Sequence, residues 1–164
     1  MTFSDFVLFD SLKPDLKAKS KGDVIQELVR ALNAAGAIAD DLVEDVIGAI
    51  TRREELGSTA IGHGVAVPHT KHLGVDRLVA VIGVSHDGVD FDALDEQTVK
   101  IFIMLVSPPD RPGDHLRALE YITTNLKVNE FTERLKAAIT PEEMTQVLKD
   151  ADARMLHNSD TNEE

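Results

Sequence analysis

The sequence predicts a single α/β (α+β) domain in which helices pack against a β-sheet. Its 164 residues suit one domain with one hydrophobic core. Two nearly continuous apolar segments, residues 78–84 and 99–106, are typical of strands that are buried on both faces. Segments with helical spacing of apolar residues come before and after these strands. This arrangement indicates a layered domain, although the order of the strands cannot be read from it.

The first third of the chain predicts two helices. Ser20 begins the first with a pattern close to a capping box, and Gly36 is a suitable residue to end it. Asp40 and Asp41 suit the positive N-terminal end of a second helix, which should end before Gly57. The expected buried residues are Val24, Ile25, Leu28, Val29 and Leu32 in the first helix, and Leu42, Val46, Ile47 and Ile50 in the second.

The middle of the chain predicts three strands, namely a short one at residues 65–67 and the two apolar segments described above. The short strand leads directly to Pro68 and His69. A turn is expected at residues 86–89, where His-Asp-Gly-Val follows the first apolar segment. The proline-rich residues 108–113 should form a loop after the last strand.

The C-terminal part predicts three more helices and a tail. Asp114 is expected to cap the first helix, and Thr140 is expected to cap the last, with Pro at the first helical position and Glu at the third. The expected buried residues are Leu116, Leu119, Ile122 and Leu126, then Phe131, Leu135 and Ile139, and finally Met144, Val147 and Leu148. The chain becomes polar near residue 152, so we expect a domain at residues 1–151 and a disordered tail at residues 152–164.

Composition and charge exclude several classes of function. A net charge of -12 repels nucleic acid and anionic membranes, but it would attract a basic patch on a partner protein. The absence of cysteine excludes disulfides, a thiolate nucleophile and sulfur ligands for a metal. The sequence has neither a signal peptide at its start nor an apolar segment long enough to cross a membrane. We therefore expect a cytoplasmic protein without membrane insertion.

Three residues are candidates for chemistry: Arg53, His69 and His115. His69 follows a glycine-rich loop whose backbone N–H groups could face an anion, and Ser58 and Thr59 would add hydroxyl donors. His115 lies in the first turn of a predicted helix, where an anion is favoured, and Arg53 offers a permanent positive charge. A neutral imidazole nitrogen is nucleophilic near pH 7 and can carry a phosphoryl group as a covalent intermediate. The pattern therefore indicates phosphoryl transfer.

Other interpretations stay open when only the spacing is considered. A single histidine after a strand is more often a hydrogen-bonded structural residue, and an arginine at a helix end is more often a solvated charge. His63, His69 and His72 together could suggest a metal site, but their spacing matches no known zinc motif. The glycine-rich stretch matches neither the Walker loop nor the dinucleotide fingerprint. We therefore expect no metal and no cofactor.

Two long segments resemble a known family. Residues 53–59, REELGST, and residues 61–69, IGHGVAVPH, closely resemble the signature of enzyme IIA of the fructose/mannitol class. These proteins belong to the bacterial phosphoenolpyruvate-dependent sugar phosphotransferase system, and the class includes the nitrogen-type regulatory IIA proteins. Residues 112–119, PGDHLRAL, resemble the family segment that holds a second active-site histidine. The resemblance spans nearly the whole chain.

The resemblance implies a mixed β-sheet flanked by helices and a role for each candidate residue. His69 would accept a phosphoryl group from a phosphohistidine HPr-like carrier protein and pass it to an acceptor of the IIB type. Arg53 would neutralise the phosphoryl oxygens, and His115 would orient His69 or bind the phosphate. His63 departs from the family pattern, which often has a smaller polar residue there.

Three functions are compatible with these residues. The first is that of a phosphotransferase component that carries phosphoryl groups during sugar uptake. The second is that of a regulator of the nitrogen type, whose phosphorylation state controls its binding to other proteins. The third, a metal-dependent hydrolase, requires a metal site that the histidine spacing does not support.

Overall fold

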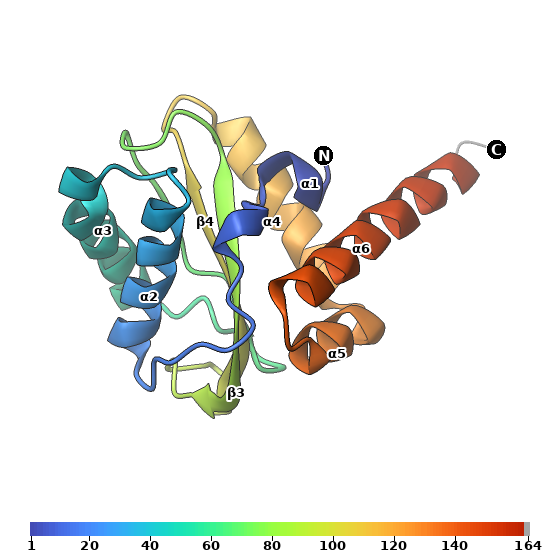
Figure 1. Cartoon of the computed structure of the whole chain (residues 1–164), viewed down its shortest axis with the longest axis horizontal. Helices are drawn as coiled ribbons and strands as arrows, with labels where there is room; N and C mark the ends of the chain where they lie inside the picture. Colours follow the sequence, from blue (N-terminus) through green and yellow to red (C-terminus); the bar gives the residue numbers. More distant parts are fainter. Residues whose placement is uncertain (163–164) are drawn as a thin grey trace.

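The computed structural model describes residues 1–162, in which helices cover both faces of a β-sheet (Figure 1). The helices are α1 (Phe3–Phe6), α2 (Lys21–Ala34), α3 (Val43–Glu55), α4 (Pro112–Leu126), α5 (Asn129–Ala137) and α6 (Pro141–Thr161), with short 3-10 helices at Phe9–Ser11 and Asp40–Leu42. The strands are β1 (Val65–Ala66), β2 (His69–Lys71), β3 (Val79–Val89) and β4 (Val99–Ser107).

Strand β4 is the centre of the four-stranded sheet. It pairs in parallel with β1 and β2 along one edge, and antiparallel with β3 along the other. The register along the first edge is continuous, since Val65 pairs with Ile101 and His69 pairs with Leu105. Pro68 divides this edge into two strands because proline has no N–H to donate. The mixed sheet that the resemblance implied is confirmed.

Two hydrophobic layers enclose the sheet. On one face, α2 and α3 pack against Phe102, Met104 and Val106 of β4. On the other face, α1, α4, α5 and α6 contribute to the layer that contains Ile103 and Leu105. Figure 1 shows α2 and α3 on one side of the strands and α4, α5 and α6 on the other. Side chains of β4 therefore enter the two layers in turn, which explains why this strand is apolar almost throughout.

Three of the predicted helix boundaries are confirmed. The side chain of Ser20 accepts a hydrogen bond from the backbone N–H of Asp23 at the start of α2. Thr140 accepts one in the same way from Glu143 at the start of α6. Gly36 follows the end of α2 with a φ of 86°, a left-handed conformation that glycine adopts without strain.

Strand β3 differs from the prediction at residues 86–89. The sequence predicted a turn there, whereas the strand continues to Val89. The pairing between β3 and β4 is irregular from Val84 to Val89, and Gly88 has a φ of 78°. The turn-forming residues therefore produce a bulge within the strand, because glycine allows a local bend while pairing resumes beyond it.

Helix α4 begins earlier than predicted, at Pro112, whose fixed φ suits the first helical position. Asp114 therefore lies within the first turn and does not cap the helix. The buried residues of this helix are His115, Ala118, Ile122 and Asn125. Leu116 is 58% exposed, and Ile139 lies outside α5 and is 77% exposed. The buried face of α4 therefore differs from the predicted one and includes His115.

Helix α6 continues to Thr161, where the sequence predicted a disordered tail from residue 152. The carboxylate of Asp152 is buried and accepts hydrogen bonds from the backbone N–H of Phe3 and the hydroxyl of Tyr121. These contacts join α6 to α1 and α4, and a local reading of polar composition does not reveal them. Residues 163 and 164 lie outside the described part of the chain. Within residues 1–162, no helix is both long and apolar enough to cross a membrane.

Candidate active site at His69

His69 begins β2 at the edge of the sheet, directly after Pro68. Its side chain is half-buried, and its Nδ1 lies 2.7 Å from the carbonyl oxygen of Val67. A carbonyl oxygen only accepts hydrogen bonds, so Nδ1 carries the proton of the neutral ring. Nε2 then holds the free lone pair, and within the described residues it has no hydrogen-bond partner. This nitrogen is the candidate nucleophile.

The surroundings of His69 keep its imidazole neutral. Burial lowers the pKa of His69 below its ordinary value of 6.5. The hydrogen bond to the Val67 carbonyl raises the pKa, the charge of Arg53 lowers it, and the charge of Glu54 raises it, with a net lowering. His69 is therefore largely uncharged at pH 7, and the Nε2 lone pair is available for nucleophilic attack.

His115 faces His69 from the first turn of α4. The centroids of the two rings are 5.4 Å apart, and the ring planes are inclined by 59°. Burial, together with the smaller effects of the charges of His69 and Lys71, lowers the pKa of His115 to about 4. Both imidazoles are therefore neutral at pH 7, so they lie close together without charge repulsion. The structure thus brings together the two histidines that the sequence singled out.

Arg53 lies in the last turn of α3, where a positive charge is favourable. Its Nη1 donates a hydrogen bond of 2.9 Å to the carbonyl oxygen of Gly57. This bond uses one of the five N–H donors of the guanidinium group, so others are left to contact an anion. Because the charge of Arg53 lowers the pKa of His69, its electrostatic field reaches the candidate nucleophile.

Ser58 and Thr59 were expected to contact a phosphoryl group, but their hydroxyls have other partners. The Ser58 hydroxyl donates to the carbonyl oxygen of Phe91 at 2.8 Å. The hydroxyl and backbone N–H of Thr59 both donate to the carboxylate of Glu54. Glu54 is buried and forms an ion pair with Lys21 at 3.1 Å. In this arrangement the two hydroxyls fix the glycine-rich loop, and each donates its proton to a group of the protein.

Sequence reasoning missed three residues around the histidines: Glu54, Lys71 and Ser107. Lys71 lies two residues after His69 in β2, so the alternation of a strand places both on one face of the sheet. The sequence analysis did not place His69 and Lys71 on one face, because it expected His69 to follow a strand, whereas His69 belongs to β2. Glu54 extends the buried stripe of α3 at helical spacing. The side chain of Ser107, at the end of β4, lies 2.5 Å from Nδ1 of His115.

His63 and His72 do not join His69 in a metal site. Both ring nitrogens of His72 are engaged, since Nε2 contacts the carboxylate of Asp45 and Nδ1 accepts a hydrogen bond from the backbone N–H of Gly74. The side chain of His63 is exposed, and its backbone is left-handed with a φ of 61°. Across residues 1–162, no group of three or more His, Asp or Glu side chains is arranged to hold a metal.

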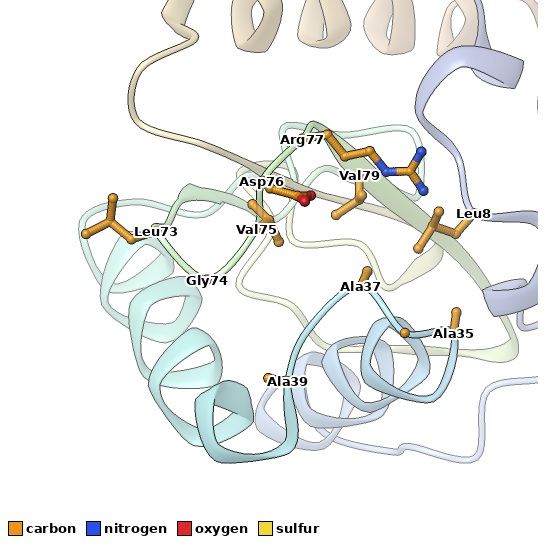
Figure 2. Close-up of a pocket in the computed structure, with 11 residues that line it drawn as sticks. Leu8, Ala35, Ala37, Ala39, Leu73, Gly74, Val75, Asp76, Arg77 and Val79 are labelled. Atoms are coloured by element: carbon orange, nitrogen blue, oxygen red, sulfur yellow. The ribbon is translucent and has the colours of Figure 1, made fainter.

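A surface pocket of about 540 Å³ lies between the end of α2 and residues 73–79 (Figure 2). Its lining consists mainly of alanine, glycine and aliphatic residues, with Asp76 and Arg77 as the charged members. Figure 2 shows the Arg77 side chain extending toward Leu8. None of the candidate residues His69, His115 or Arg53 lines this pocket. The candidate chemistry is therefore located elsewhere, at the edge of the sheet.

Comparison with known proteins supplies the family. The family model described as "Phosphoenolpyruvate-dependent sugar phosphotransferase system, EIIA 2" matches residues 8–151. The chain is 30% identical over 148 residues to a nitrogen regulatory protein from Bradyrhizobium diazoefficiens. This alignment covers 90% of this chain and 95% of that protein. It is also 30% identical over 152 residues to a fructose-specific EIIABC component from Bacillus subtilis, covering 93% of this chain but 24% of that protein.

Solved structures agree with this result. The nitrogen regulatory protein IIA-Ntr from Neisseria meningitidis has a TM-score of 0.80 at 27% identity, over 89% of this chain and 98% of that one. IIA mannitol from Escherichia coli has a TM-score of 0.70 at 22% identity, over 85% of this chain and 96% of that one, which supports the shared fold. The chain therefore belongs to the type 2 EIIA family of phosphocarriers of the phosphoenolpyruvate-dependent sugar phosphotransferase system.

Proposed function

We propose that Nε2 of His69 accepts a phosphoryl group from a phosphohistidine HPr-like carrier protein. The observation that carries this proposal is the 2.7 Å contact between Nδ1 of His69 and the Val67 carbonyl, which leaves the lone pair on Nε2. The bond between Nε2 and phosphorus forms as the P–N bond of the donor breaks, and the donor nitrogen keeps the electron pair. The Val67 carbonyl and the Glu54 carboxylate stabilise the positive charge that develops on the His69 ring.

Positive charge near His69 also offsets the negative charge of the phosphoryl group. A phosphoryl group brings about -1.5 to -2 charges at pH 7, and the chain already has a net charge of -12. The guanidinium of Arg53 offsets part of this charge, and Lys71 adds a second cation on the same face of β2 as His69. The ring of His115 lies beside that of His69, which supports a contact between His115 and the phosphoryl oxygens.

Regulation of the nitrogen type is the output that the similarities favour. The likeness to nitrogen regulatory proteins extends over nearly their whole length, both in the Bradyrhizobium sequence and in the Neisseria structure. In this role, phosphorylation of His69 adds charge to a site at the sheet edge and thereby changes the affinity for a partner protein.

The alternative output is phosphoryl transfer to a IIB-type protein during sugar uptake. It is supported by the similarity to the fructose-specific EIIABC component. The fold also resembles that of the IIA mannitol protein solved in complex with phosphorylated IIB from Escherichia coli, at a TM-score of 0.71. The chemistry at His69 is the same in both roles, so only the acceptor separates them.

The first experiment combines the purified protein with phosphoenolpyruvate, enzyme I and an HPr-like carrier, and follows the intact mass. We expect one added phosphoryl group that is labile in acid and stable in base, as for phosphohistidine. His69→Ala should take up none. The control is His86→Ala, because His86 is an exposed histidine of β3 whose ring forms one hydrogen bond among the described residues, to the Pro14 carbonyl. Uptake of the label by His69→Ala would contradict the proposal.

The second experiment supplies purified IIB proteins to the phosphorylated chain. Regulation predicts that the phosphoryl group stays on the chain, and that phosphorylation changes its affinity for a partner protein. Rapid transfer to one IIB protein, lost when that acceptor is mutated at its phosphorylation site, would instead establish the role in sugar uptake.

A further inference from the structure

Ser107 ends β4 beneath the candidate site and is fully buried. Its Oγ lies 2.5 Å from Nδ1 of His115, and in the part of the chain that the structure describes it has no other hydrogen-bond partner. We propose that Ser107 is a positioning residue, which donates its hydroxyl proton to Nδ1 of His115 and so fixes the tautomer that carries a proton on Nε2. The consequence for transfer rests on the proposed role of His69.

The direction of this hydrogen bond follows from the number of protons available. A neutral imidazole has one N–H donor and one acceptor nitrogen. If Nδ1 of His115 donated to Ser107, the hydroxyl hydrogen of Ser107 would be buried without an acceptor, which is unfavourable. If Ser107 donates instead, both groups are satisfied by a single hydrogen bond. The pKa of His115, lowered to about 4, keeps the ring neutral at pH 7, so the tautomer is a meaningful choice.

The register of the sheet places Ser107 where it can act on the site. His69 pairs with Leu105, and Lys71 pairs with Ser107 in the same parallel ladder. Residues two apart in a strand share a face, so His69, Lys71 and Ser107 all lie on the face that α4 covers. His115 enters this face from α4, with Nδ1 held by Ser107 and its ring beside that of His69.

The tautomer decides whether His115 attracts or repels the phosphoryl group. With Nδ1 occupied by Ser107, Nε2–H is the remaining donor of the ring, and it can donate to a phosphoryl oxygen on His69. In the opposite tautomer, Nε2 would present a lone pair to those negatively charged oxygens. Ser107 therefore acts on the reaction only through His115, without touching the phosphoryl group itself.

Nitrogen NMR of the unphosphorylated protein tests the tautomer directly. With ¹⁵N-labelled histidine, we expect His115 to be almost entirely the Nε2–H form at pH 7, and Ser107→Ala to convert it to a mixture. Ser85→Ala is the matched control, since Ser85 is a buried serine of the neighbouring strand β3 whose Oγ accepts from Gly88. An Nδ1–H form in the unmodified protein, or an unchanged spectrum in Ser107→Ala, would overturn the proposal.

A double-mutant cycle tests the consequence for transfer. Ser107→Ala should slow phosphorylation by about tenfold, in line with the loss of partners that orient a reactive histidine in metal sites. Combined with His115→Ala, it should cause no further loss, because Ser107 acts through His115. Ser107→Thr, which keeps the hydroxyl, should restore both the rate and the Nε2–H signal.

The outcomes separate this proposal from the proposed function. If the double variant is a further tenfold slower than His115→Ala, Ser107 acts by another route and the inference is wrong. If no form of the protein takes up a phosphoryl group, the proposed function of His69 is wrong, whereas the NMR result still decides the tautomer. Circular dichroism and the melting temperature of each variant show whether a lost rate reflects lost folding.

Discussion

Two histidines at β2 show how differently the same side chain can be used. His69 begins the strand, and within the described part of the chain its ring forms one hydrogen bond, between Nδ1 and the Val67 carbonyl. His72 directly follows the strand and engages both nitrogens, with the Asp45 carboxylate and the Gly74 backbone. Both side chains are at least partly buried, so burial does not distinguish them. The difference lies in Nε2 of His69, which has no hydrogen-bond partner among residues 1–162. This makes His69 the candidate nucleophile, whereas the contacts of His72 are those of a structural link.

The charges around the two histidines also differ. The nearest ionised partner of His72 is a carboxylate, which holds the ring in place. His69 is influenced by the guanidinium of Arg53 and is followed on the same face of β2 by Lys71. Such cations are suited to an incoming phosphoryl group, whereas the carboxylate beside His72 would repel one. The charges near His69 therefore suit binding of an anion, whereas the charge near His72 does not.

Substitution of each histidine by glutamine gives the largest expected contrast. His69→Gln should lose all phosphoryl uptake, because an amide lacks the imidazole lone pair that attacks phosphorus. His72→Gln should keep full uptake. The measurement is intact mass after incubation with phosphoenolpyruvate, enzyme I and the HPr-like carrier, followed by mapping of the modified peptide.

The opposite result would contradict this interpretation of His69 and His72. If the phosphoryl group is found on His72, or if His69→Gln is phosphorylated as fast as the unmodified protein, then the free nitrogen of His69 is not what defines the site.

Much of the fold could be predicted from the sequence, and so could the candidate residue at the centre of the site. The apolar runs that became β3 and β4 contain enough local information, since strands buried on both faces must be apolar throughout. The caps at Ser20 and Thr140 are equally local, because each side chain bonds to a backbone N–H three residues away. His69 was identified through a long uninterrupted signature, which spacing alone would not have provided.

The remaining features depend on contacts that local sequence patterns do not reveal. Ser107 meets His115 only because β4 ends beneath the start of α4, and neither residue has a neighbour in sequence that signals this. The hydroxyl of Ser58 was expected to bind phosphate, yet it bonds to Phe91, far along the chain. Asp152 was assigned to a disordered tail, but it caps the backbone at Phe3. Local composition contains no information about such partners.

Removal of the positive charge at Arg53 should have the second-largest effect on phosphorylation of His69. Arg53→Met should slow phosphorylation by about 10² to 10³-fold, as for the loss of one group that stabilises the transition state. It should also move the acidic limb of the pH–rate profile to higher pH. The reason is that the charge of Arg53 lowers the pKa of His69, so its loss raises that pKa and protonates the nucleophile earlier as the pH falls.

Arg52→Met is the control, since Arg52 is an exposed arginine of the same helix turn. Equal rates for the two variants, or an acidic limb that stays in place in Arg53→Met, would show that the guanidinium does not act on His69.

The second histidine of the site should appear in the pH dependence of stability. The pKa of His115 is about 4 in the folded protein, below the ordinary value of 6.5. The folded state therefore binds fewer protons, and this contribution is present above pH 6.5 and is lost as the pH falls toward 4. The full loss amounts to about 3 kcal/mol of unfolding free energy.

Urea unfolding at pH 7 and at pH 4 measures this contribution. His115→Asn should show a smaller fall in unfolding free energy between these two values than the unmodified protein, and His86→Gln should match the unmodified protein. The same fall in His115→Asn would mean that another group is responsible for the acid sensitivity.

The smallest expected effect belongs to His72, and it completes the comparison with His69. His72→Gln removes the contact with Asp45, whose side chain is 67% exposed, so solvent screens much of the interaction. The unfolding free energy should fall by about 1 kcal/mol, the usual contribution of one hydrogen bond, while the rate of phosphorylation stays unchanged. Urea unfolding and the phosphorylation assay on the same preparation measure both quantities. A variant of normal stability that is phosphorylated tenfold more slowly would place His72 in the reaction, and the engagement of both ring nitrogens would then not mark a purely structural histidine.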